Sequence, residues 1–459
     1  MKRRDFLTAG VALTSGAAIS SLSTACGRVA PHIEKKKRAP SIHTGVLVVG
    51  GGPAGIGAAI ASAKMGAETL LIETYGFFGG IASQSVGMVI NQMRPDGKPR
   101  GFIHELLFDK LKSYGDQAVK LSTHQFWVNV EYLKVAILDA LEEVNCKYLV
   151  HLKAVDAITE GDRVTGVVVS TKSGLMDIYA DVVIDCTGDA DIAHFSGAPT
   201  LKETGNLSPQ TLLLNVSNVK QFSQDDMKGV VAKAKGQFPL IPSGWDEGWS
   251  LLPVSNCHHF YINHSGTRDM GNFDITDPYQ FSDAECKSRR QVIQMTEAMR
   301  RFGGGDLKNC EIVGASTQIG VRESRRIKGG YILTEEDANE GKKFEDAIAW
   351  RSGYLDVGFV YLTPMKVHQV PYRSLLPEGL DGLLAAGRCI SATHVGASSG
   401  KSMGNCIATG HAAGIAAALT SKTGVQPRNL DVSQIQRILT LDGVDLSKGG
   451  ESQSEDMAL

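Results

Sequence analysis

The chain has 459 residues, of which 42% are hydrophobic and 21% charged, and its 47 Lys and Arg residues nearly balance 49 Asp and Glu residues for a net charge of −2. This composition is that of an ordinary globular protein and excludes a disordered, collagen-like or coiled-coil chain. Near-neutrality also gives no reason to expect nucleic acid or an anionic membrane surface as a partner. The length predicts roughly two to four domains, or one large α/β core.

Residues 1–26 have the pattern of an export address rather than of folded structure. The stretch RRDFL near the start resembles the twin-arginine export signal, and the weakly apolar stretch after it is too short and too mild for a transmembrane helix. An amphipathic N-terminal helix is the competing interpretation. Two processing modes stay open: lipoprotein-type cleavage that leaves Cys26 as a lipid anchor, or ordinary cleavage near Ala25. We therefore expect a periplasmic or cell-envelope location, with residues 27–44 as a solvated linker.

A glycine-rich loop joins the first predicted strand to the first predicted helix. The apolar run GVLVV predicts a buried parallel strand, GGGPAG follows at once, and an Ala-rich helix and a second strand come next. In this context Gly50 permits a tight turn, Gly52 lets the backbone approach a pyrophosphate, and Gly55 permits close packing of helix on strand. Glu73 ends the second strand, where a carboxylate accepts hydrogen bonds from ribose hydroxyls. The sequence therefore predicts a dinucleotide site at this loop.

Further elements are expected along the chain. They are a second glycine-rich loop at 75–83, an antiparallel meander at 155–158, 164–170 and 176–180, a buried strand that ends in TGD at 182–189, an amphipathic helix at 283–302, a strand at 382–388 and a helix from about 405 to 419. The eight cysteines show no CxxC or ferredoxin-type spacing, so haem c, an iron–sulfur cluster and structural zinc lack support, and we expect buried free thiols. His258 and His259 are adjacent, but no third ligand accompanies them, and we expect no metal site.

Several segments resemble one family of flavoproteins. They are VLVVGGGPAGIGAAIASAKMG, VVIDCTGDADIA, QIGVRESRRIKGGYILTEED, VPYRSLLP and LLAAGRCISATHVGASSGKSMGNCIATGHAAG, in this order from about 46 to 420. The family is that of bacterial FAD-dependent oxidoreductases, glutathione-reductase-like two-dinucleotide-fold proteins distantly related to fumarate reductase flavoproteins. The resemblance implies an α/β fold in which a Rossmann-like FAD-binding domain with a β-meander is interrupted by an inserted α+β cap.

The resemblance also divides the chain into parts. They are a signal peptide at 1–26, a linker at 27–44, the first part of the FAD-binding domain at 45–190, a cap or substrate domain at 191–370, the second FAD-binding part at 371–425, and a C-terminal helix with a loose tail at 426–459.

The cofactor that the resemblance implies is FAD. It would be held without a covalent bond, because residues 74–90 lack the His through which related fumarate reductases attach it. The implied FAD-binding residues are Gly50, Gly52, Gly55, Glu73, Gly79, Gly80, Ala154, Thr187, Gly188, Gly387, Arg388, Gly404, Asn405 and Cys406. The last three open a helix whose N-terminus would face the flavin pyrimidine oxygens and stabilise negative charge on the reduced ring.

The sequence lacks two motifs that related flavoproteins use to exchange electrons with disulfides or with NADPH. Residues 74–100 hold no Cys pair of the disulfide-reductase kind, and no second strand–GxGxxG–helix unit is present for NADPH. Reducing equivalents would then come from the organic substrate and pass to an external acceptor, which could be a quinone, a cytochrome or oxygen.

Three side chains are the candidates for work on the substrate. His394 is a base or a hydrogen-bonding partner, with a structural role equally open. Arg322 and Arg325 suit a carboxylate or an anion beside the flavin, or else form internal salt bridges with Glu323 or Asp356.

Three departures from the family pattern put the anchoring of the substrate in question. They are Lys401 in place of Arg, Gly404 in place of Pro and Gly358 in place of His. The sequence thus predicts an exported FAD-dependent oxidoreductase that moves a hydride between a small polar substrate, such as a hydroxy compound or an amine, and flavin N5. The alternatives are a double-bond reductase of the fumarate-reductase type and a non-catalytic exported flavoprotein for electron transfer.

Overall fold

The structure is a computed structural model, and it describes residues 38–86, 88–121, 125–220, 222–242, 251–254, 259–262, 265–357 and 361–452. The expected signal peptide, Cys26, Cys257, His258 and Gly358 lie outside these residues.

A parallel block of strands forms the centre of the fold. Within the seven-stranded sheet it has the order β6-β2-β1-β9-β20, with bounds Lys147–Leu149, Thr69–Ile72, Ala39–Val49, Gly174–Asp185 and Leu383–Ala385. Val46, Val48 and Leu71 are fully buried, as the near-continuous apolar runs of a parallel sheet require. The expected α/β class is confirmed.

Strand β9 belongs to two parts of the sheet at once. Its first half pairs antiparallel with β8 (Arg163–Thr171), which pairs in turn with β7 (Lys153–Glu160), whereas its last residues pair in parallel with β20. The expected third meander strand and the expected buried strand after it are therefore one continuous strand. β1 runs along the other edge of β9 from Ala39 onward, so residues 39–44 of the expected linker are part of the sheet.

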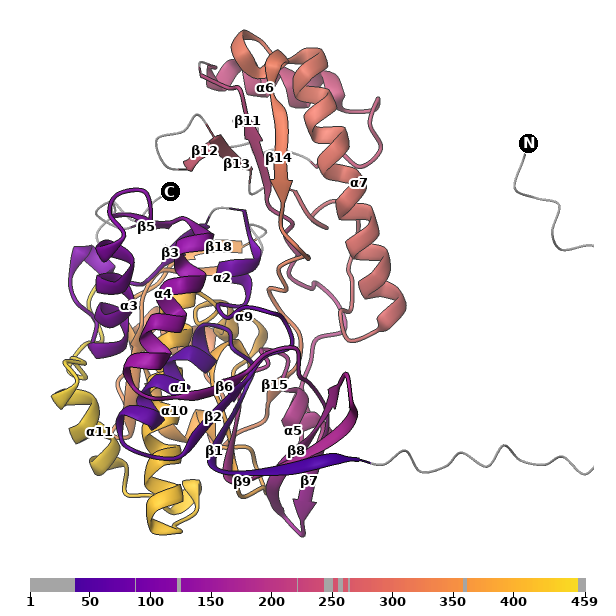
Figure 1. Cartoon of the computed structure of the whole chain (residues 1–459). Helices are drawn as coiled ribbons and strands as arrows, with labels where there is room; N and C mark the ends of the chain where they lie inside the picture. The colour runs from indigo at the N-terminus through magenta and orange to yellow at the C-terminus, as the bar shows by residue number, and fades with distance from the viewer. Residues whose placement is uncertain are drawn as a thin grey trace, which may run out of the picture. The chain divides into compact units, whose positions relative to one another are not determined.

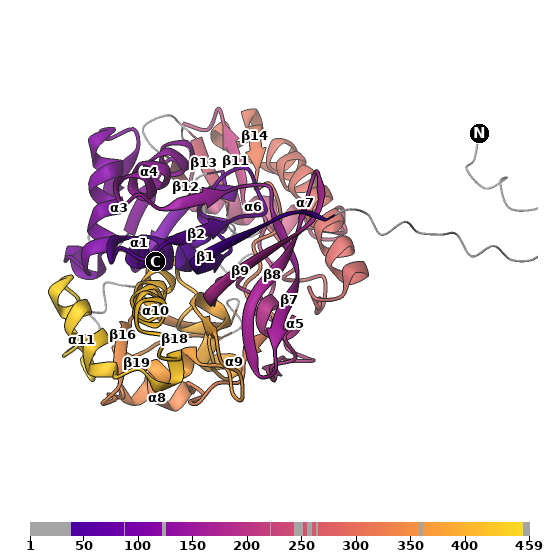
Figure 2. The same ribbon diagram turned by 60° about the horizontal axis from the view of Figure 1, so that its bottom comes forward.

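Helices α1 (Pro53–Lys64) and α10 (Met403–Thr423) pack directly against each other, as Figure 2 shows. A Cβ atom on Gly410 would lie 2.0 Å from the carbonyl oxygen of Ala54, and one on Gly414 would lie 2.3 Å from that of Ala58. Only glycine lets the two backbones approach this closely. This contact fixes the start of α10 against the glycine-rich loop that precedes α1.

The remaining elements on this side complete the main core. They are α2 (Ile81–Gln84), the sheet β3-β5-β4 (Met88–Asn91, Gln125–Val128, Val119–Leu121), α3 (Phe102–Ser113) and α4 (Val130–Glu143). Helices α3 and α4 lie beside α1 (Figure 1) and bury Ile103, Leu111 and Ile137 in the core that they share with α1 and α10. Helix α5 (Asp191–Phe195) instead buries Ile192 and Ala193 in a separate core with residues of β1, β8 and β9.

A second core lies in the expected cap. Its elements are the antiparallel sheet β12-β13-β11-β14 (Leu251–Val254, His259–Ile262, Leu214–Ser217, Glu311–Ala315) and the helices α6 (Gln224–Ala234) and α7 (Pro278–Phe302), which Figure 1 shows together. Helix α7 begins five residues before the expected 283, because the Asp277 side chain accepts hydrogen bonds from the N–H groups of Tyr279 and Gln280.

The end of the expected cap differs from the expectation. The elements outside the cap core are β15 with β10 (Arg326–Ile327, Thr200–Leu201), α8 (Glu335–Glu340), β16 with β19 (Ala347–Arg351, His368–Pro371), β17 with β18 (Tyr354–Val357, Tyr361–Pro364) and α9 (His394–Ser398). Ile348, Ala349 and Val370 of the pair β16 and β19 belong to the main core. The cap core is thus confined to residues between about 212 and 319, because apolar side chains beyond it are buried against α10 instead.

The chain end also differs from the expected loose tail. After α11 (Val432–Leu441), Asp442 accepts a hydrogen bond from the backbone N–H of Phe102, and the backbone of Val367 bonds to both Gly450 and Glu451. Polar composition predicted a solvated tail, but backbone hydrogen bonds, which composition does not reveal, hold residues 442–451 on the main body.

No helix in the described part of the chain is long and apolar enough to cross a membrane. The same residues contain no group of three His, Cys, Asp or Glu side chains placed to hold a metal ion. Cys146, Cys186, Cys310, Cys389 and Cys406 are buried free thiols, whereas Cys286 is exposed on α7.

Candidate functional site

The first glycine-rich loop turns sharply between β1 and α1. Gly50 has φ +101°, and a Cβ atom there would lie 2.6 Å from the carbonyl oxygen of Cys186 at the end of β9. A Cβ atom on Gly55 would lie 1.8 Å from the carbonyl oxygen of Gly50. Gly52 is the N-cap of α1 and provides no side-chain cap, so the positive end of this helix is open to an anion.

Glu73 holds the loop in place from the end of β2. Its two carboxylate oxygens accept hydrogen bonds from the N–H groups of Gly51 (2.7 Å) and Tyr75 (2.9 Å). Burial raises the pKa of this carboxyl, although the two N–H donors oppose the rise. The sequence predicted a contact with ribose; this second role, a clamp on the glycine loop, was not predicted.

The second glycine-rich loop lies on the first. The N–H of Gly79 donates to the carbonyl oxygen of Gly51 (2.7 Å), and a Cβ atom on Gly80 would lie 3.0 Å from the Cα atom of Gly52. Both Gly79 (φ +113°) and Gly80 (φ +52°) have positive φ. The structure therefore brings these two residues together with the first loop, as the sequence predicted.

The TGD turn after β9 is built on a carboxylate that the sequence did not single out. Asp185 is fully buried and accepts hydrogen bonds from the hydroxyl of Thr187 (2.6 Å) and from the N–H groups of Ile192 and Ala193 at the start of α5. Burial raises the pKa of Asp185 to about 6. The turn leaves Gly188 with φ +80°, a conformation that favours glycine.

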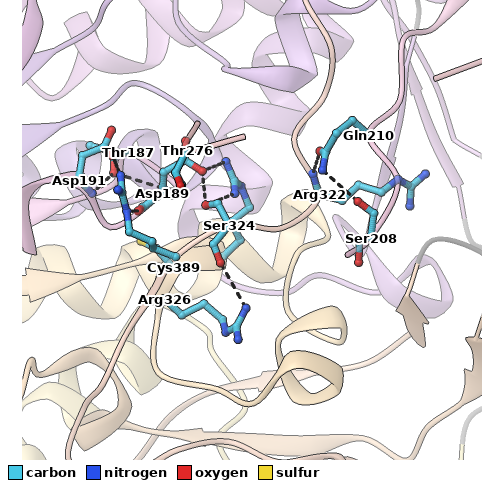
Figure 3. Close-up of polar contacts among 12 residues, drawn as sticks. Thr187, Asp189, Asp191, Ser208, Gln210, Thr276, Arg322, Ser324, Arg326 and Cys389 are labelled. Atoms are coloured by element: carbon cyan, nitrogen blue, oxygen red, sulfur yellow. Dashed lines mark hydrogen bonds and ion pairs between the residues drawn. The ribbon is translucent and has the colours of Figure 1, made fainter. Parts of the chain in front are cut away.

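Arg388 packs against this turn from the other half of the fold. A Cβ atom on Gly188 would lie 3.0 Å from its guanidinium, which also pairs with Asp189 at 2.8 Å and contacts the hydroxyl of Ser324 at 3.2 Å. Figure 3 shows Asp189 and Ser324 side by side, with Thr187 and Asp191 next to them.

Ala154 lies in β7, two residues after Leu152, whose N–H donates to the carbonyl oxygen of Glu73 (2.9 Å). The start of this meander strand is therefore near the end of β2.

The start of α10 is a glycine-lined turn. A Cβ atom on Gly404 would lie 1.9 Å from the carbonyl oxygen of Gln92, which explains why this position holds Gly and not Pro. The side-chain amide of Asn405 donates to the carbonyl oxygen of Ser399 (2.9 Å), and the Cys406 thiol contacts that of Gly400 (3.4 Å). Burial raises the pKa of Cys406 to about 11, so this residue is a neutral thiol.

Gly387 lies between the two long helices. Its N–H donates to the hydroxyl of Thr409 on α10 (3.0 Å), and a Cβ atom on it would lie 2.8 Å from the Cβ atom of Ala54 on α1. The structure thus places Gly387, with φ +89°, beside both helix starts.

These features fit a dinucleotide cofactor. The hydroxyls of Ser83, Ser85 and Ser402 are buried, and no described residue partners them, although each could bond to a ligand. Ser83 and Ser85 follow the second glycine loop, and Ser402 is the N-cap of α10, where its side chain caps nothing. The open helix starts at α1 and α10, with glycine backbones between them, form a cradle whose N–H groups suit a bound anion such as a pyrophosphate.

A polar pocket lies beside this cradle, and Figure 3 shows Ser208, Arg322, Ser324 and Arg326 of its lining. Its lining is Ser208, Arg322, Glu323, Ser324, Arg326, Arg388, His394, Ala397, Ser398 and Lys401.

His394 and Glu323 form a short polar contact in this pocket, with 2.5 Å between Nδ1 of the imidazole and Oε1 of the carboxylate. Glu323 also accepts hydrogen bonds from the N–H of Ser208 (2.9 Å) and from Arg326 (3.4 Å). Burial opposes ionisation of Glu323, but the donors from His394 and Ser208 outweigh it, and the pKa of Glu323 is lowered. The carboxylate is therefore charged and holds the imidazole ring by its Nδ1 side.

The two candidate arginines make different contacts, and only one of them lines the pocket. Arg322 lines the pocket and pairs with Asp356 on β17 at 3.0 Å, one of the salt bridges weighed from the sequence. Arg325 does not line it: this side chain pairs with Asp191 at 2.5 Å and donates to the carbonyl oxygen of Asp189. The structure thus brings Arg322, but not Arg325, to the pocket that holds His394.

Lys401 is a member of the pocket that the sequence marked only as a departure from the family pattern. Its Nζ lies 3.1 Å from the Asp356 carboxylate, which Arg322 also contacts. Burial lowers the pKa of Lys401 to about 8, although Asp356 opposes the shift. The signal that could have found it was the unusual residue type next to the start of α10.

One protein family matches nearly the whole described chain. A sequence model of the FAD dependent oxidoreductase family matches residues 45–439. Thiamine thiazole synthase of Methanococcus vannielii is 33% identical over 160 residues, 33% of this chain and 59% of that protein, so the chain spans less than two thirds of this relative's length.

Solved structures are similar at lower identity. An aromatic hydroxylase from angucycline biosynthesis has 15% identity, a TM-score of 0.49 and coverage of 90% of this chain and 70% of that one. A geranylgeranyl bacteriochlorophyll reductase-like protein from Thermoplasma acidophilum has 15% identity, a TM-score of 0.45 and coverage of 87% and 83%.

Proposed function

Because this chain belongs to the family of FAD-dependent oxidoreductases, we propose that it is an exported dehydrogenase of a small polar substrate, such as a hydroxy compound or an amine. The observation that carries the proposal is the His394–Glu323 pair in a polar pocket beside the cofactor cradle. FAD, when bound without a covalent bond, supplies the acceptor for a hydride from the substrate carbon.

The protein's own part is to remove the proton. Because Nδ1 of His394 faces a charged carboxylate, that nitrogen carries the proton, and Nε2 is left as the base. As the substrate loses a hydride from carbon, the proton of its O–H or N–H group passes to Nε2. Glu323 then stabilises the imidazolium, as the oriented acid of a base–carboxylate pair does.

The cations of the pocket bind and orient the substrate. Arg322 and Lys401 both contact the Asp356 carboxylate and line the pocket, and their positive charge suits a polar or anionic group of the substrate. Turnover ends when an external acceptor takes the electrons; a quinone, a cytochrome and oxygen are the candidates.

The test is a His394→Ala variant, assayed by anaerobic bleaching of bound FAD with a panel of hydroxy acids and amines. We expect the rate of bleaching to fall by a factor of about 10² or more, because a general base ordinarily contributes at least this much to the rate. FAD should remain bound. His194→Ala, on the exposed surface of α5, is the matched control. Undiminished bleaching by His394→Ala would remove His394 from the mechanism.

The same pair favours a second candidate, the reduction of a carbon–carbon double bond. An imidazolium held by Glu323 would donate its proton to a substrate carbon, FAD in its reduced form would supply the hydride, and Arg322 suits a substrate carboxylate. Oxidation of chemically reduced FAD by unsaturated acids, with no bleaching by saturated substrates, would favour this reductase. A flavoprotein inert to both panels would instead favour an electron-transfer role.

Export rests on the N-terminal sequence. Conversion of Arg3 and Arg4 to Lys should retain the protein in the cytoplasm, as fractionation would show. A Cys26→Ala variant that still sediments with membranes would argue against a lipid anchor.

A further inference from the structure

Two arginine side chains are buried under the start of α10 without an acidic partner. Arg100 is 3% exposed and Arg351, at the end of β16, is 1% exposed. Neither forms an ion pair with any carboxylate in the part of the chain that the structure describes. Arg351 repels Arg100, and Cys406, the other group that acts on both, is a neutral thiol. Buried charges are ordinarily paired, because an unpaired one is costly to remove from water.

The contacts of Arg100 are neutral. Its guanidinium donates to the carbonyl oxygens of Gln92 (2.7 Å) and Trp350 and to the side-chain oxygen of Asn405 (2.7 Å) in the first turn of α10. It also lies 4.3 Å from the centre of the Trp350 ring. These groups satisfy the N–H donors of Arg100 but cancel none of its charge.

Arg351 is less satisfied. It donates only a long hydrogen bond, 3.3 Å, to the hydroxyl of Ser399, and its Nε atom is buried and unpartnered among the described residues. The guanidinium lies against Gly400, where a Cβ atom would be 2.1 Å from its Cζ atom. Its neighbour His368 has a pKa lowered to about 4 by burial and is neutral, so it supplies no counter-charge.

Both positive charges therefore sit at the place where the α10 helix presents its own positive end. Gly400 and Asn405 flank Ser402, the N-cap whose buried hydroxyl has no described partner. Burial lowers the pKa of Arg351 to about 10, and burial with repulsion from Arg351 lowers that of Arg100 to about 9, so both remain charged at neutral pH. Such a concentration of buried positive charge is stable when an anion comes to lie beside it.

We propose that Arg351, supported by Arg100, stabilises the negative charge that reduction places on the isoalloxazine ring of FAD. A hydride adds two electrons and one proton to the neutral oxidised ring, which leaves one net negative charge. Gly400 is small so that the Arg351 guanidinium can lie under the turn that opens α10. This inference rests on the proposed function, since it requires FAD at this helix start.

The test measures the cofactor and not the turnover. Full-length mature protein loaded with FAD is compared as wild type, Arg351→Met, Arg351→Lys and, as a control, Arg428→Met, which removes a surface ion pair with Asp381. Sulfite is the probe, because its adduct with flavin carries the same added negative charge. We expect Arg351→Met to weaken sulfite binding at least tenfold and to lower the two-electron midpoint potential by the corresponding 30 mV or so. Arg351→Lys should retain most of both, and Arg428→Met should change neither.

An Arg351→Met protein with a full complement of FAD but unchanged sulfite affinity and potential would overturn the proposal. If that variant lost only affinity for an anionic substrate, the site would bind the substrate's carboxylate, and the proposal would again be wrong. Should Arg351→Met fail to fold, the wild-type protein decides: its photoreduced flavin must show the anionic spectrum on the acid side of neutrality, and a neutral reduced spectrum there refutes the role. Failure of the wild type to bind any flavin would instead refute the proposed function.

Discussion

The packing of α10 on α1 predicts that one added methyl group destabilises the protein where it would ordinarily stabilise a helix. Gly410→Ala should gain up to about 1 kcal/mol from helix propensity. The new Cβ atom, however, would lie 2.0 Å from the carbonyl oxygen of Ala54, an atom of the α1 backbone that cannot rotate away. Overpacking of this kind costs about 1–3 kcal/mol, so we expect a net loss of about 1–2 kcal/mol and a melting temperature lower by about 2–4 °C.

A matched variant separates the two effects. Gly229→Ala lies inside α6, where nothing is within 4 Å of the new Cβ atom, and it should leave the melting temperature unchanged or raise it. Thermal unfolding of both variants, with and without added FAD, is the assay, and Gly410→Ala should also bind FAD more weakly because Ala54 belongs to the first turn of α1 after the loop. Equal melting temperatures for the two variants would refute the reasoning from close packing.

Three further predictions concern other parts of the site and fold. Glu73→Gln loses the charge that holds the N–H groups of the glycine loop, so FAD affinity measured by fluorescence titration should fall about tenfold, and an unchanged affinity would contradict the clamp. Burial lowers the pKa of Lys401 in the folded protein to about 8, against an ordinary 10.5, so between these pH values the folded chain binds fewer protons than the unfolded chain. The free energy of unfolding of the wild type, relative to Lys401→Met, should therefore rise from pH 8 to pH 10.5. A difference that does not change with pH would contradict the burial argument. Ending the chain at Leu441 removes Asp442, which accepts from the buried His411 (2.8 Å), and should cost about 1–3 kcal/mol in a denaturant titration; a loose tail would cost nothing.

The sequence predicted those parts of the site that depend on backbone conformation. Gly50, Gly79 and Gly387 all have positive φ. Glycine-rich motifs indicate such turns because glycine alone adopts positive φ freely.

Side-chain partnerships across the chain could not be predicted in the same way. The choice of Asp191 for Arg325 and of Asp356 for Arg322 depends on how the cap segment meets the main core. The burial of Arg100 and Arg351 had no signal at all, because an isolated arginine in sequence is ordinarily exposed. The attachment of the C-terminal tail could not be predicted for a related reason, since its partners are backbone groups of distant residues.

The cofactor cradle is built from segments near both ends of the chain, so it can form only late in folding. β9 has an incomplete edge at Val183 to Asp185 until β20 arrives from the C-terminal part, and α1 lacks its packing partner until α10 has been synthesised. Contacts between such distant segments close slowly, and an open strand edge in the interval is prone to pairing with other chains. FAD can therefore be enclosed only after nearly the whole chain has left the ribosome. Cofactor uptake then reports the completion of folding, and an N-terminal fragment should neither hold flavin nor stay in solution.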